Sequence, residues 1–458
     1  MTGQAWGQCA GPGAGHGVRT AVVRLVVTAT LAGLLALVLG CGGVGTTQPG
    51  QPVQPTPPPP APPVEQPTTG LLRPSDLAYV GAFRLPEGSG GSDWAYSGDA
   101  VAYFPGGDPE GPDDGFPGSL FGVGHDWHKQ VSEISIPVPV DSPGRRLADL
   151  NTARTLRPFT DVHTSVGRLG VLDEMLRVGM TYLPPQGSQA TGKLYLCFGQ
   201  HFQEDDDRRV ASHMWCETDL SGSAGAWWVG DESIYAVNDY MLEIPQAWAD
   251  AHAAGMRLGT GRFRDGGWSG QGPSLFAIAP WRHGDPPPDG TRLEALPLLR
   301  YSSTATDEEP FHTLRDYHHS DEWSGGAWLT AGDRAALIFV GTKGVGECWY
   351  GLPDGTVWEE PYPDDPLGQR GWWSTQFVGQ ILFYDPADLA AVARGEMQPW
   401  EPQPYATMNL DGGLFAVAGT QQKHHVGDCC FDRARGLLYL FEPLADDEKS
   451  LVHVWRVQ

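Results

Sequence analysis

A short motif recurs along most of this chain, and it constrains the fold more than any other feature of the sequence. An aromatic residue or histidine, a small or β-branched residue and then glycine stand before an apolar run. The copies are AYSGDAVAYFP from Ala95, a weaker LRVGMTYLP from Leu176, GWSGQGPSLFAIAPW from Gly267, EWSGGAWLTAG from Glu322 and HHVGDCCFD from His424. Self-similarity of this kind indicates a repeat architecture in which each copy begins one supersecondary unit.

The segments that follow the motif read as further strands of the same units. A second apolar run follows most copies and a third follows several, as in KLYLCFG from Lys193 and VASHMWCETDL from Val210. Short strands separated by Gly and Pro favour an all-β fold, and repetition of multi-stranded units favours a ring. The sequence therefore predicts a five-bladed β-propeller with long loop insertions and a few short helices. Six or seven blades, or a two-sheet sandwich, are the alternatives.

Two further patterns support this prediction. The segment DLAYVGAFRLP, residues 76–86, has no unit of its own, and we expect it to close the ring as the outermost strand of the last blade. Residues 241–256 and 381–397 each place Pro near the first turn of a helix and Gly after its last turn. Each segment is predicted to be an outer strand that leads into a short helix.

The N-terminus carries a targeting pattern that is kept out of the fold argument. Arg19 and Arg24 flank or enter an apolar run that ends at Val38-Leu39-Gly40-Cys41, which resembles a bacterial lipoprotein signal with its lipobox. The resemblance implies a signal peptide over 1–40, acylation of Cys41 and an extracytoplasmic protein that contacts a bacterial membrane only through its lipid. Residues 41–70 are then a Pro-rich tether, and 71–458 form the propeller domain. An uncleaved membrane anchor is the alternative.

Charge and cysteine content narrow the possible partners. The chain has 55 acidic residues against 30 Lys and Arg, for a net charge of −25, which argues against nucleic-acid binding because phosphate would be repelled. Of seven cysteines, Cys9 and Cys41 lie in or next to the signal, so five remain in the mature domain. Cys197 and Cys216 are the preferred disulfide pair, and no zinc-type Cys/His spacing is present. We expect a monomer.

The motifs also locate the candidate functional residues. In a propeller the first strand of each unit lines the central channel, and the loops entering these strands surround its mouth. Aromatic faces stack on sugars, and carboxylates bind hydroxyls or perform acid–base chemistry, so a polysaccharide or oligosaccharide ligand is predicted. The candidates are Asp93, Tyr96, Asp99, Asp173, Glu174, Asp265, Trp268, His318, His319, Asp321, Glu322, Trp323, His424, His425 and Asp428.

A five-bladed ring with inner-strand carboxylates resembles the propellers of glycoside hydrolase families that act on arabinan, xylan or fructan. The resemblance is architectural, without a complete family motif. By this resemblance Asp99 and Asp428, at equivalent Gly-Asp steps, are the base and the orienting carboxylate in either order, and Glu322 is the acid. The predicted substrate-binding residues are Tyr96, Trp268, Trp323, His319 and His425.

Each of these residues also has a structural interpretation. Asp after Gly at the start of a strand often caps a turn, and repeated Trp residues often pack between blades. The His318-His319 and His424-His425 pairs favour a divalent metal only weakly, because neighbours on a strand face opposite sides. No cofactor is predicted. The competing functions are glycan hydrolysis, non-catalytic binding of a glycan or protein, and metal-dependent hydrolysis.

Overall fold

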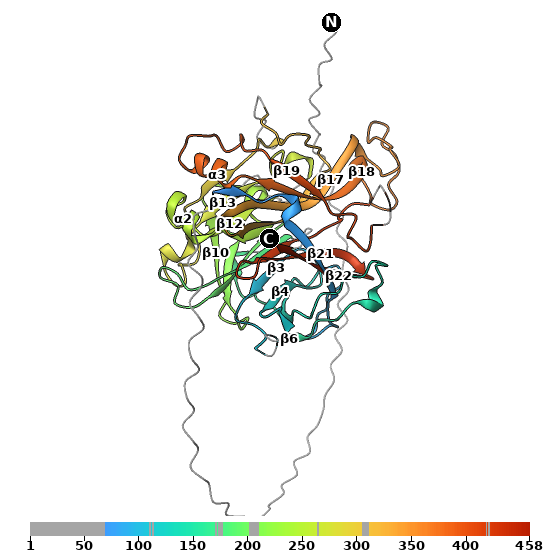
Figure 1. Cartoon of the computed structure of the whole chain (residues 1–458). Coiled ribbons are helices and arrows are strands. Elements are labelled where there is room, and N and C mark those ends of the chain that lie inside the picture. The colour runs from blue at the N-terminus through green and yellow to red at the C-terminus, as the bar shows by residue number, and fades with distance from the viewer. Residues whose placement is uncertain are drawn as a thin grey trace, which may run out of the picture. The chain divides into compact units, whose positions relative to one another are not determined.

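Five small sheets stand around a common axis and form a five-bladed β-propeller, as predicted (Figure 1). A computed structural model describes residues 69–458 except 110, 112–113, 170–171, 173–176, 201–209, 263–264, 305–310, 418 and 420–421. Cys41, the signal segment and most of the tether lie outside the described residues. Residues 61–458 form one compact unit.

The blades contain four or five strands each, ordered here from the axis outward. Blade 1 contains β3 (Val101–Phe104), β4 (Ser119–Val123), β5 (Val131–Ser135) and β6 (Thr155–Thr160). Blade 2 contains β7 (Arg177–Leu183), β8 (Lys193–Gly199), β9 (His213–Glu217), β10 (Ala224–Val229) and β14 (Arg292–Leu293). Blade 3 contains β11 (Tyr240–Glu243), β12 (Leu258–Gly261), β13 (Leu275–Ile278) and β15 (Leu296–Leu299). Blade 4 contains β16 (Glu322–Ala331), β17 (Arg334–Gly351), β18 (Gly371–Tyr384) and β19 (Ala406–Asn409), with β1 (Gly70–Leu71) beside β17; blade 5 contains β20 (Cys429–Asp432), β21 (Leu437–Asp446), β22 (Lys449–Val457) and β2 (Leu77–Arg84).

The innermost strands make a closed ring. β3 packs beside β7, β7 beside β11, β11 beside β16, β16 beside β20, and β20 again beside β3. Such closure leaves room for neither a sixth blade nor a two-sheet sandwich. Large apolar clusters fill the spaces between neighbouring blades.

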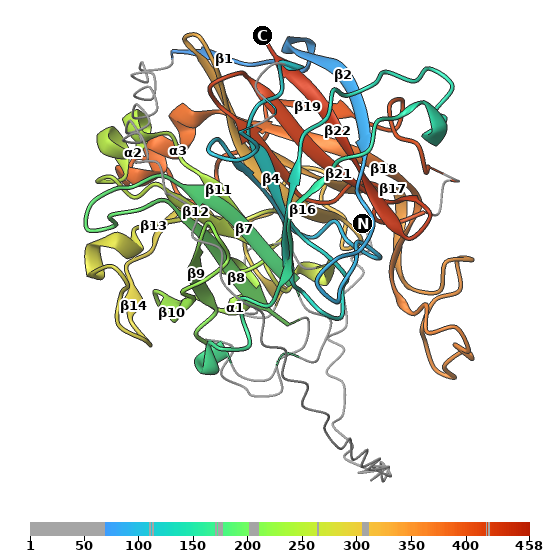
Figure 2. The same cartoon turned by 90° about the horizontal axis from the view of Figure 1, so that it is seen from below.

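The two ends of the described chain complete one blade together, which confirms the predicted ring closure. β2 pairs antiparallel with β22 from Leu77↔Val457 to Arg84↔Leu451. Figure 2 shows β2, in blue, lying along β22, in red. Closure by strands from opposite ends of the sequence covers an edge that would otherwise be open to pairing with another chain.

The structure corrects the prediction for the third unit. The inner strand of blade 3 is β11, not the segment after Gly267, which leads into β13, the third strand from the axis. Both strands are buried, so apolar content alone does not distinguish an inner strand from one farther out. For the same reason, the helix predicted within residues 241–256 was expected to follow an outer strand. In the structure this helix follows β11, the inner strand.

Both predicted helices form. They are α2 (Gln246–His252) and α3 (Pro386–Ala393), and Asp385 Oδ1 accepts a hydrogen bond from the Ala387 backbone N–H at 2.7 Å to cap α3. The other short helices are α1 (Ile234–Val237), η1 (Pro74–Asp76), η3 (Leu147–Asp149), η4 (Gly167–Leu169), η5 (Asp265–Gly267) and η6 (Pro280–His283). Within the described ranges, no helix combines the length and apolarity needed to span a membrane.

The glycine of the repeated motif has a steric role. A Cβ on Gly179 of β7 would lie 2.7 Å from Tyr240 Cα of β11, and a Cβ on Gly427 would lie 2.2 Å from the Gly98 carbonyl oxygen. Neighbouring inner strands approach most closely at these points, so a side chain there would force them apart. The motif glycine is therefore needed because neighbouring inner strands lie close together where the strands begin.

The predicted disulfide does not form. Cys197 of β8 lies opposite His213, and Cys216 of β9 lies opposite Leu194, so the two side chains enter different apolar clusters. All five cysteines in the described part of the chain are free. Adjacent Cys429 and Cys430 face opposite sides of β20, as the alternation of a strand requires.

Candidate functional site

A charged residue stands at the start of every inner strand. Asp99 lies shortly before β3, Arg177 begins β7, Asp239 precedes β11, Glu322 begins β16 and Asp428 precedes β20. Because all five inner strands begin at the same end of the ring, these side chains meet at one mouth of the channel. One cation among four carboxylates makes this mouth the strongest candidate site.

Arg177 holds two of the carboxylates together. Its Nη2 lies 2.8 Å from Glu322 Oε1, and its Nη1 lies 3.7 Å from Asp99 Oδ1. His424 Nδ1 lies 2.6 Å from Glu322 Oε2, and Lys129 Nζ forms an ion pair with Asp99. The side chains of Asp99, Glu322 and Arg177 retain 23%, 17% and 32% of their exposure, so a ligand in solution can reach them.

The surrounding charges keep two of the carboxylates ionised. Burial raises the pKa of Asp99, but Lys129 and Arg177 together outweigh it and leave this pKa below its ordinary value. Burial also opposes ionisation of Glu322, yet His424 and Arg177 hold the pKa of Glu322 far below its usual range. Both groups are therefore acceptors at neutral pH.

Asp239 behaves in the opposite way. Burial raises its pKa to about 7, although Arg177 and Arg262 partly counter this effect. The negative charges of Asp99 and Glu322 add to the increase. Near neutral pH a substantial fraction of Asp239 is therefore a protonated carboxylic acid beside two carboxylates.

Asp428 is the most deeply buried of the four. It is fully buried, and its Oδ2 accepts a hydrogen bond from the Val101 backbone N–H at 2.9 Å. Among the described residues, Asp428 Oδ1 has no hydrogen-bond partner. A Cβ added to Gly325 would lie 2.3 Å from this oxygen. Burial raises the pKa of Asp428 well above the ordinary value, against the hydrogen bonds from the Val101 and Cys429 backbone. Asp428 thus joins blades 5 and 1, and its burial favours the protonated form of the carboxyl group.

Three of the predicted ligand-binding residues offer surface to solvent or lie at the mouth. Tyr96 is 48% exposed and donates its hydroxyl to Glu448 at 2.8 Å. Trp268 is 38% exposed in the loop that enters β13, and the pairing of β13 with β12 places this loop at the mouth end. His319 stacks on Trp372, with 4.4 Å between ring centroids.

Two others are enclosed, which corrects the predicted role of each. Trp323 is completely buried in the apolar core between blades, so it serves as packing and not as a stacking platform. His425 is also buried, with its Nδ1 2.8 Å from Asp411 Oδ1 and its Nε2 2.9 Å from the Gln422 carbonyl. Both ring nitrogens are engaged inside the protein and neither points at a ligand.

The remaining candidates have local roles. Asp93 accepts a hydrogen bond from the Ala95 backbone N–H at 2.9 Å. Asp321 is buried and binds Lys343 Nζ at 2.8 Å, while His318 Nδ1 lies 3.0 Å from Ser374 Oγ. Asp173, Glu174 and the Asp265 side chain lie outside the described residues. In the part of the chain that is described, no three His, Cys, Asp or Glu side chains gather in a way that would hold a metal ion.

Sequence reasoning missed Arg177, Asp239 and Lys129. Asp239 was missed because β11 was interpreted as an outer strand, so the residue before it was not compared with the other strand starts. Arg177 stands in the weaker motif copy LRVG, where its position alone was a usable signal. Lys129 lies between β4 and β5, and only the tertiary structure brings it to Asp99.

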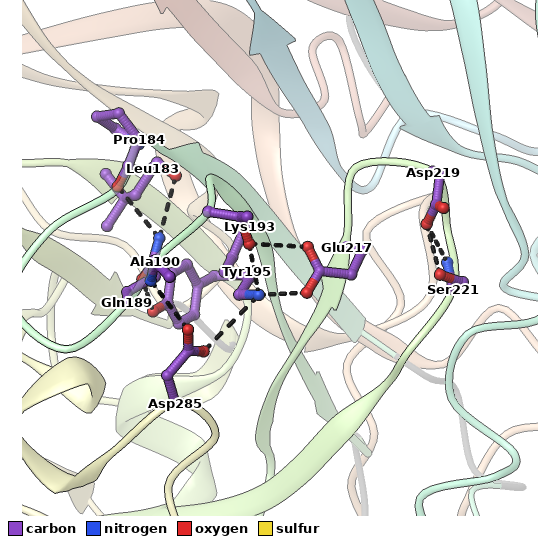
Figure 3. A network of polar contacts seen from close by, with 11 residues as sticks. Leu183, Pro184, Gln189, Ala190, Lys193, Tyr195, Glu217, Asp219, Ser221 and Asp285 are labelled. Atoms are coloured by element: carbon purple, nitrogen blue, oxygen red, sulfur yellow. Dashed lines mark hydrogen bonds and ion pairs between the residues drawn. The ribbon is translucent and has the colours of Figure 1, made fainter.

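A second polar cluster lies at the other end of blade 2 and is structural (Figure 3). Lys193 pairs with Leu183, at the end of β7 opposite Arg177. Its buried amine forms ion pairs with Glu217 and, at 3.7 Å, with Asp285 from the segment after β13. Asp285 also accepts a hydrogen bond from the Ala190 backbone N–H at 2.9 Å. The cluster joins blades 2 and 3 through one buried cation shared by two carboxylates.

Comparison with known proteins adds no assignment: no protein-family model matches the chain, and no curated protein matches it. The geometry of the mouth therefore carries the functional argument by itself.

Proposed function

We propose that this protein is an extracytoplasmic, lipid-anchored propeller that binds a glycan at the mouth and hydrolyses a glycosidic bond. One observation carries the proposal. Carboxyl groups from different blades surround Arg177, and their pKa values differ. Asp99 and Glu322 are ionised, while the pKa of Asp239 is about 7. Glycoside hydrolysis needs such a pair, one carboxylic acid and one carboxylate on either side of the bond.

The acidities assign the roles differently from the sequence-based expectation. Asp239 is the proton donor to the glycosidic oxygen, because Glu322 is too strongly held in its ionised form to donate a proton. Asp99 is the base that takes a proton from the attacking water, after ligand binding displaces it from part of its contact with Lys129 or Arg177. Glu322 positions Arg177, and Trp268 supports the sugar.

A non-catalytic glycan-binding propeller is the second candidate, and the ion pairs favour it. Asp99 and Glu322 each contact cationic partners, as expected of a preorganised polar binding surface. In that function the carboxylates accept sugar hydroxyls without proton transfer. The two candidates differ only in whether a bond is broken.

A screen for released reducing sugar separates them. Residues 61–458 would be incubated with arabinan, arabinoxylan, levan, cellulose and peptidoglycan at several pH values, with and without a chelator. Hydrolysis by the proposed groups predicts release from at least one polymer, a rate that falls as the pH rises through about 7, and a loss of about 100-fold or more in Asp239→Asn.

The control for this screen is Asp231→Asn, a change at an exposed carboxylate that, within the described ranges, forms an ion pair with Arg292 at the surface and with no other residue. It should leave the rate unchanged. Glycan binding without release from any polymer would establish the binding function instead.

A further inference from the structure

Blade 4 extends beyond its sheet as a two-stranded ribbon. The pairing of β16 with β17 stops at Glu322, and β19 reaches only the inner part of β18. Residues 343–351 and 371–378 therefore pair with each other outside the rest of the sheet, and Gly351 also bridges to Val357 in the tip. We call the hairpin of residues 343–378 the arm (Figure 2). Because Glu322 marks the mouth end of β16, the arm rises from the rim of the mouth.

The arm concentrates aromatic side chains, most of which already have partners. The aromatic residues of its strands and tip are Trp349, Tyr350, Trp358, Tyr362, Trp372, Trp373 and Phe377. Lys423 Nζ lies 4.0 Å from the Trp373 ring centroid. The Arg370 guanidinium lies 4.9 Å from the ring of Trp358. Trp349 differs, because among the described residues it has neither a ring nor a cation against its face.

Trp349 borders a hollow on one face of the arm. The hollow has a volume of about 590 Å³, and Glu347, Asp354 and Thr375 also line it. The Trp349 indole N–H donates to the Leu352 carbonyl at 2.9 Å, which fixes the ring and satisfies its polar edge. The ring therefore presents apolar surface to the hollow, in a volume within the range of small-ligand sites.

The polar groups around this ring fit sugar hydroxyls. The Glu347 carboxylate has no ion-pair partner among the described residues. Asp354 accepts local hydrogen bonds from Thr356, from its backbone N–H at 2.9 Å and from its side chain. Aromatic rings beside hydrogen-bond acceptors match the apolar face and the hydroxyl edge of a sugar.

The charge of the arm selects among glycans. Residues 343–378 contain six acidic residues and two basic ones, for a net charge of −4. An anionic polymer would be repelled, whereas an uncharged one would not. Trp372 of the arm stacks on His319 at the mouth. The register Trp349↔Trp373 and Tyr350↔Trp372 places Trp349 on the other face of the ribbon, so the surface around Trp349 is separate from this stack.

We propose that the arm is a second glycan-binding site, with Trp349 as its stacking platform and uncharged polysaccharide chains as its ligands. The inference rests on the proposed function for the class of ligand and goes beyond it by placing a site outside the mouth. A polymer held at both places extends over several sugar units, so the ligand is a chain rather than a single sugar. Binding at two linked places raises the overall affinity without new contacts at either.

Affinity gel electrophoresis of the full chain tests the site. The gels would contain arabinoxylan, linear arabinan, levan or hydroxyethyl cellulose as uncharged polymers and polygalacturonate as the anionic one. We expect retardation by at least one uncharged polymer and none by polygalacturonate. Trp349→Ala should weaken binding about tenfold, and Glu347→Gln, a change at an exposed unpaired group, about threefold.

Trp358→Ala is the matched control, because Arg370 already covers that ring, and it should bind as the wild type does. Equal retardation of wild type, Trp349→Ala and Glu347→Gln overturns the arm site, as does preferential binding of polygalacturonate. A shift from dimer to monomer in Trp349→Ala with unchanged retardation also overturns it, in favour of self-association. Retardation that needs Trp349, without sugar release from any polymer, contradicts hydrolysis and leaves the arm site standing.

Discussion

At the scale of single residues, the mouth is governed by the competition between burial and charge. Asp99, Asp239 and Glu322 are the same type of group within one site, yet the pKa is lowered in two of them and raised in the third. In Asp239 the effect of burial exceeds that of Arg177 and Arg262, whereas the cations around Asp99 and Glu322 outweigh burial. No property of an isolated aspartate in the sequence reports this.

The first prediction concerns the pH dependence of stability. The pKa of Asp239 is about 7 in the folded protein and about 3.9 in an unfolded chain, so the folded state holds more protons between these values. The contribution of this group to the free energy of unfolding therefore falls as the pH rises from about 4 to 7. Asp239→Asn should flatten this part of the profile, measured by urea unfolding at several pH values.

The charged groups that act on Asp239 stay charged between about pH 4 and 7, so they do not obscure its titration. They are Arg177, Arg262, Asp99 and Glu322. Asp428, whose pKa is also raised, contributes in both proteins and cancels in the comparison. An unchanged slope in Asp239→Asn would show that the carboxyl is ionised throughout.

The second prediction concerns the bridging cation. Arg177→Gln leaves Asp99 and Glu322 as neighbouring carboxylates without their shared partner, and we expect a loss of about 2 kcal/mol in the free energy of unfolding, discounted for the partial exposure of the site. Arg146→Gln removes a far more exposed pair with Asp149 and should have little effect, because solvent screens it. Equal effects of the two changes in chemical denaturation would contradict the bridging role.

At the scale of the elements, glycine decides how closely the inner strands approach. Gly325 in β16 faces Asp428, which precedes β20, and the two strands are neighbours in the ring. A larger residue would meet a buried carboxyl group that is fixed by its hydrogen bond to Val101. The motif glycine Gly325 is therefore a packing requirement.

The third prediction tests this requirement. A Cβ on Gly325 would lie 2.3 Å from Asp428 Oδ1 and 2.7 Å from Asp428 Cα, so Gly325→Ala should cost about 2 kcal/mol or more through overpacking. Gly412→Ala is the control, because a Cβ there meets nothing within 4 Å. Thermal unfolding of the two variants gives the comparison, and similar midpoints would argue against a tight contact between these strands.

At the scale of the whole molecule, the propeller depends on joining its two ends. β2 comes from the start of the described chain and β22 from its end, and their pairing completes blade 5. Leu77, Phe83 and Leu85 of this N-terminal segment are buried in the clusters on either side of blade 5. Blade 5 therefore unites the two ends of the described sequence in one sheet, and β1 adds a second N-terminal pairing, with β17 of blade 4.

The fourth prediction follows from this closure. A chain that begins at residue 87 lacks β1, β2 and the buried side chains of Leu72, Leu77, Phe83 and Leu85, worth about 8 kcal/mol in apolar burial. We expect it to unfold at a lower temperature and to aggregate through the exposed edge of β22. A chain that begins at residue 61 keeps the whole compact unit and serves as the control. Matching unfolding curves for the two chains would mean that the ring does not need its closing strand.

From the sequence we predicted five blades, the ring closure through residues 76–86, both helices and most of the motif positions at the mouth. These depend on local patterns, namely alternating apolar strands, turn residues and the spacing of similar segments. The identity of the inner strand in blade 3, the free state of Cys197 and Cys216, and the burial of Trp323 and His425 were decided only by the tertiary structure. Each of these depends on the direction in which a side chain points and on the distant segment that packs against it. Asp239 belongs to this second group, because its acidity depends on burial and on charges from three other blades.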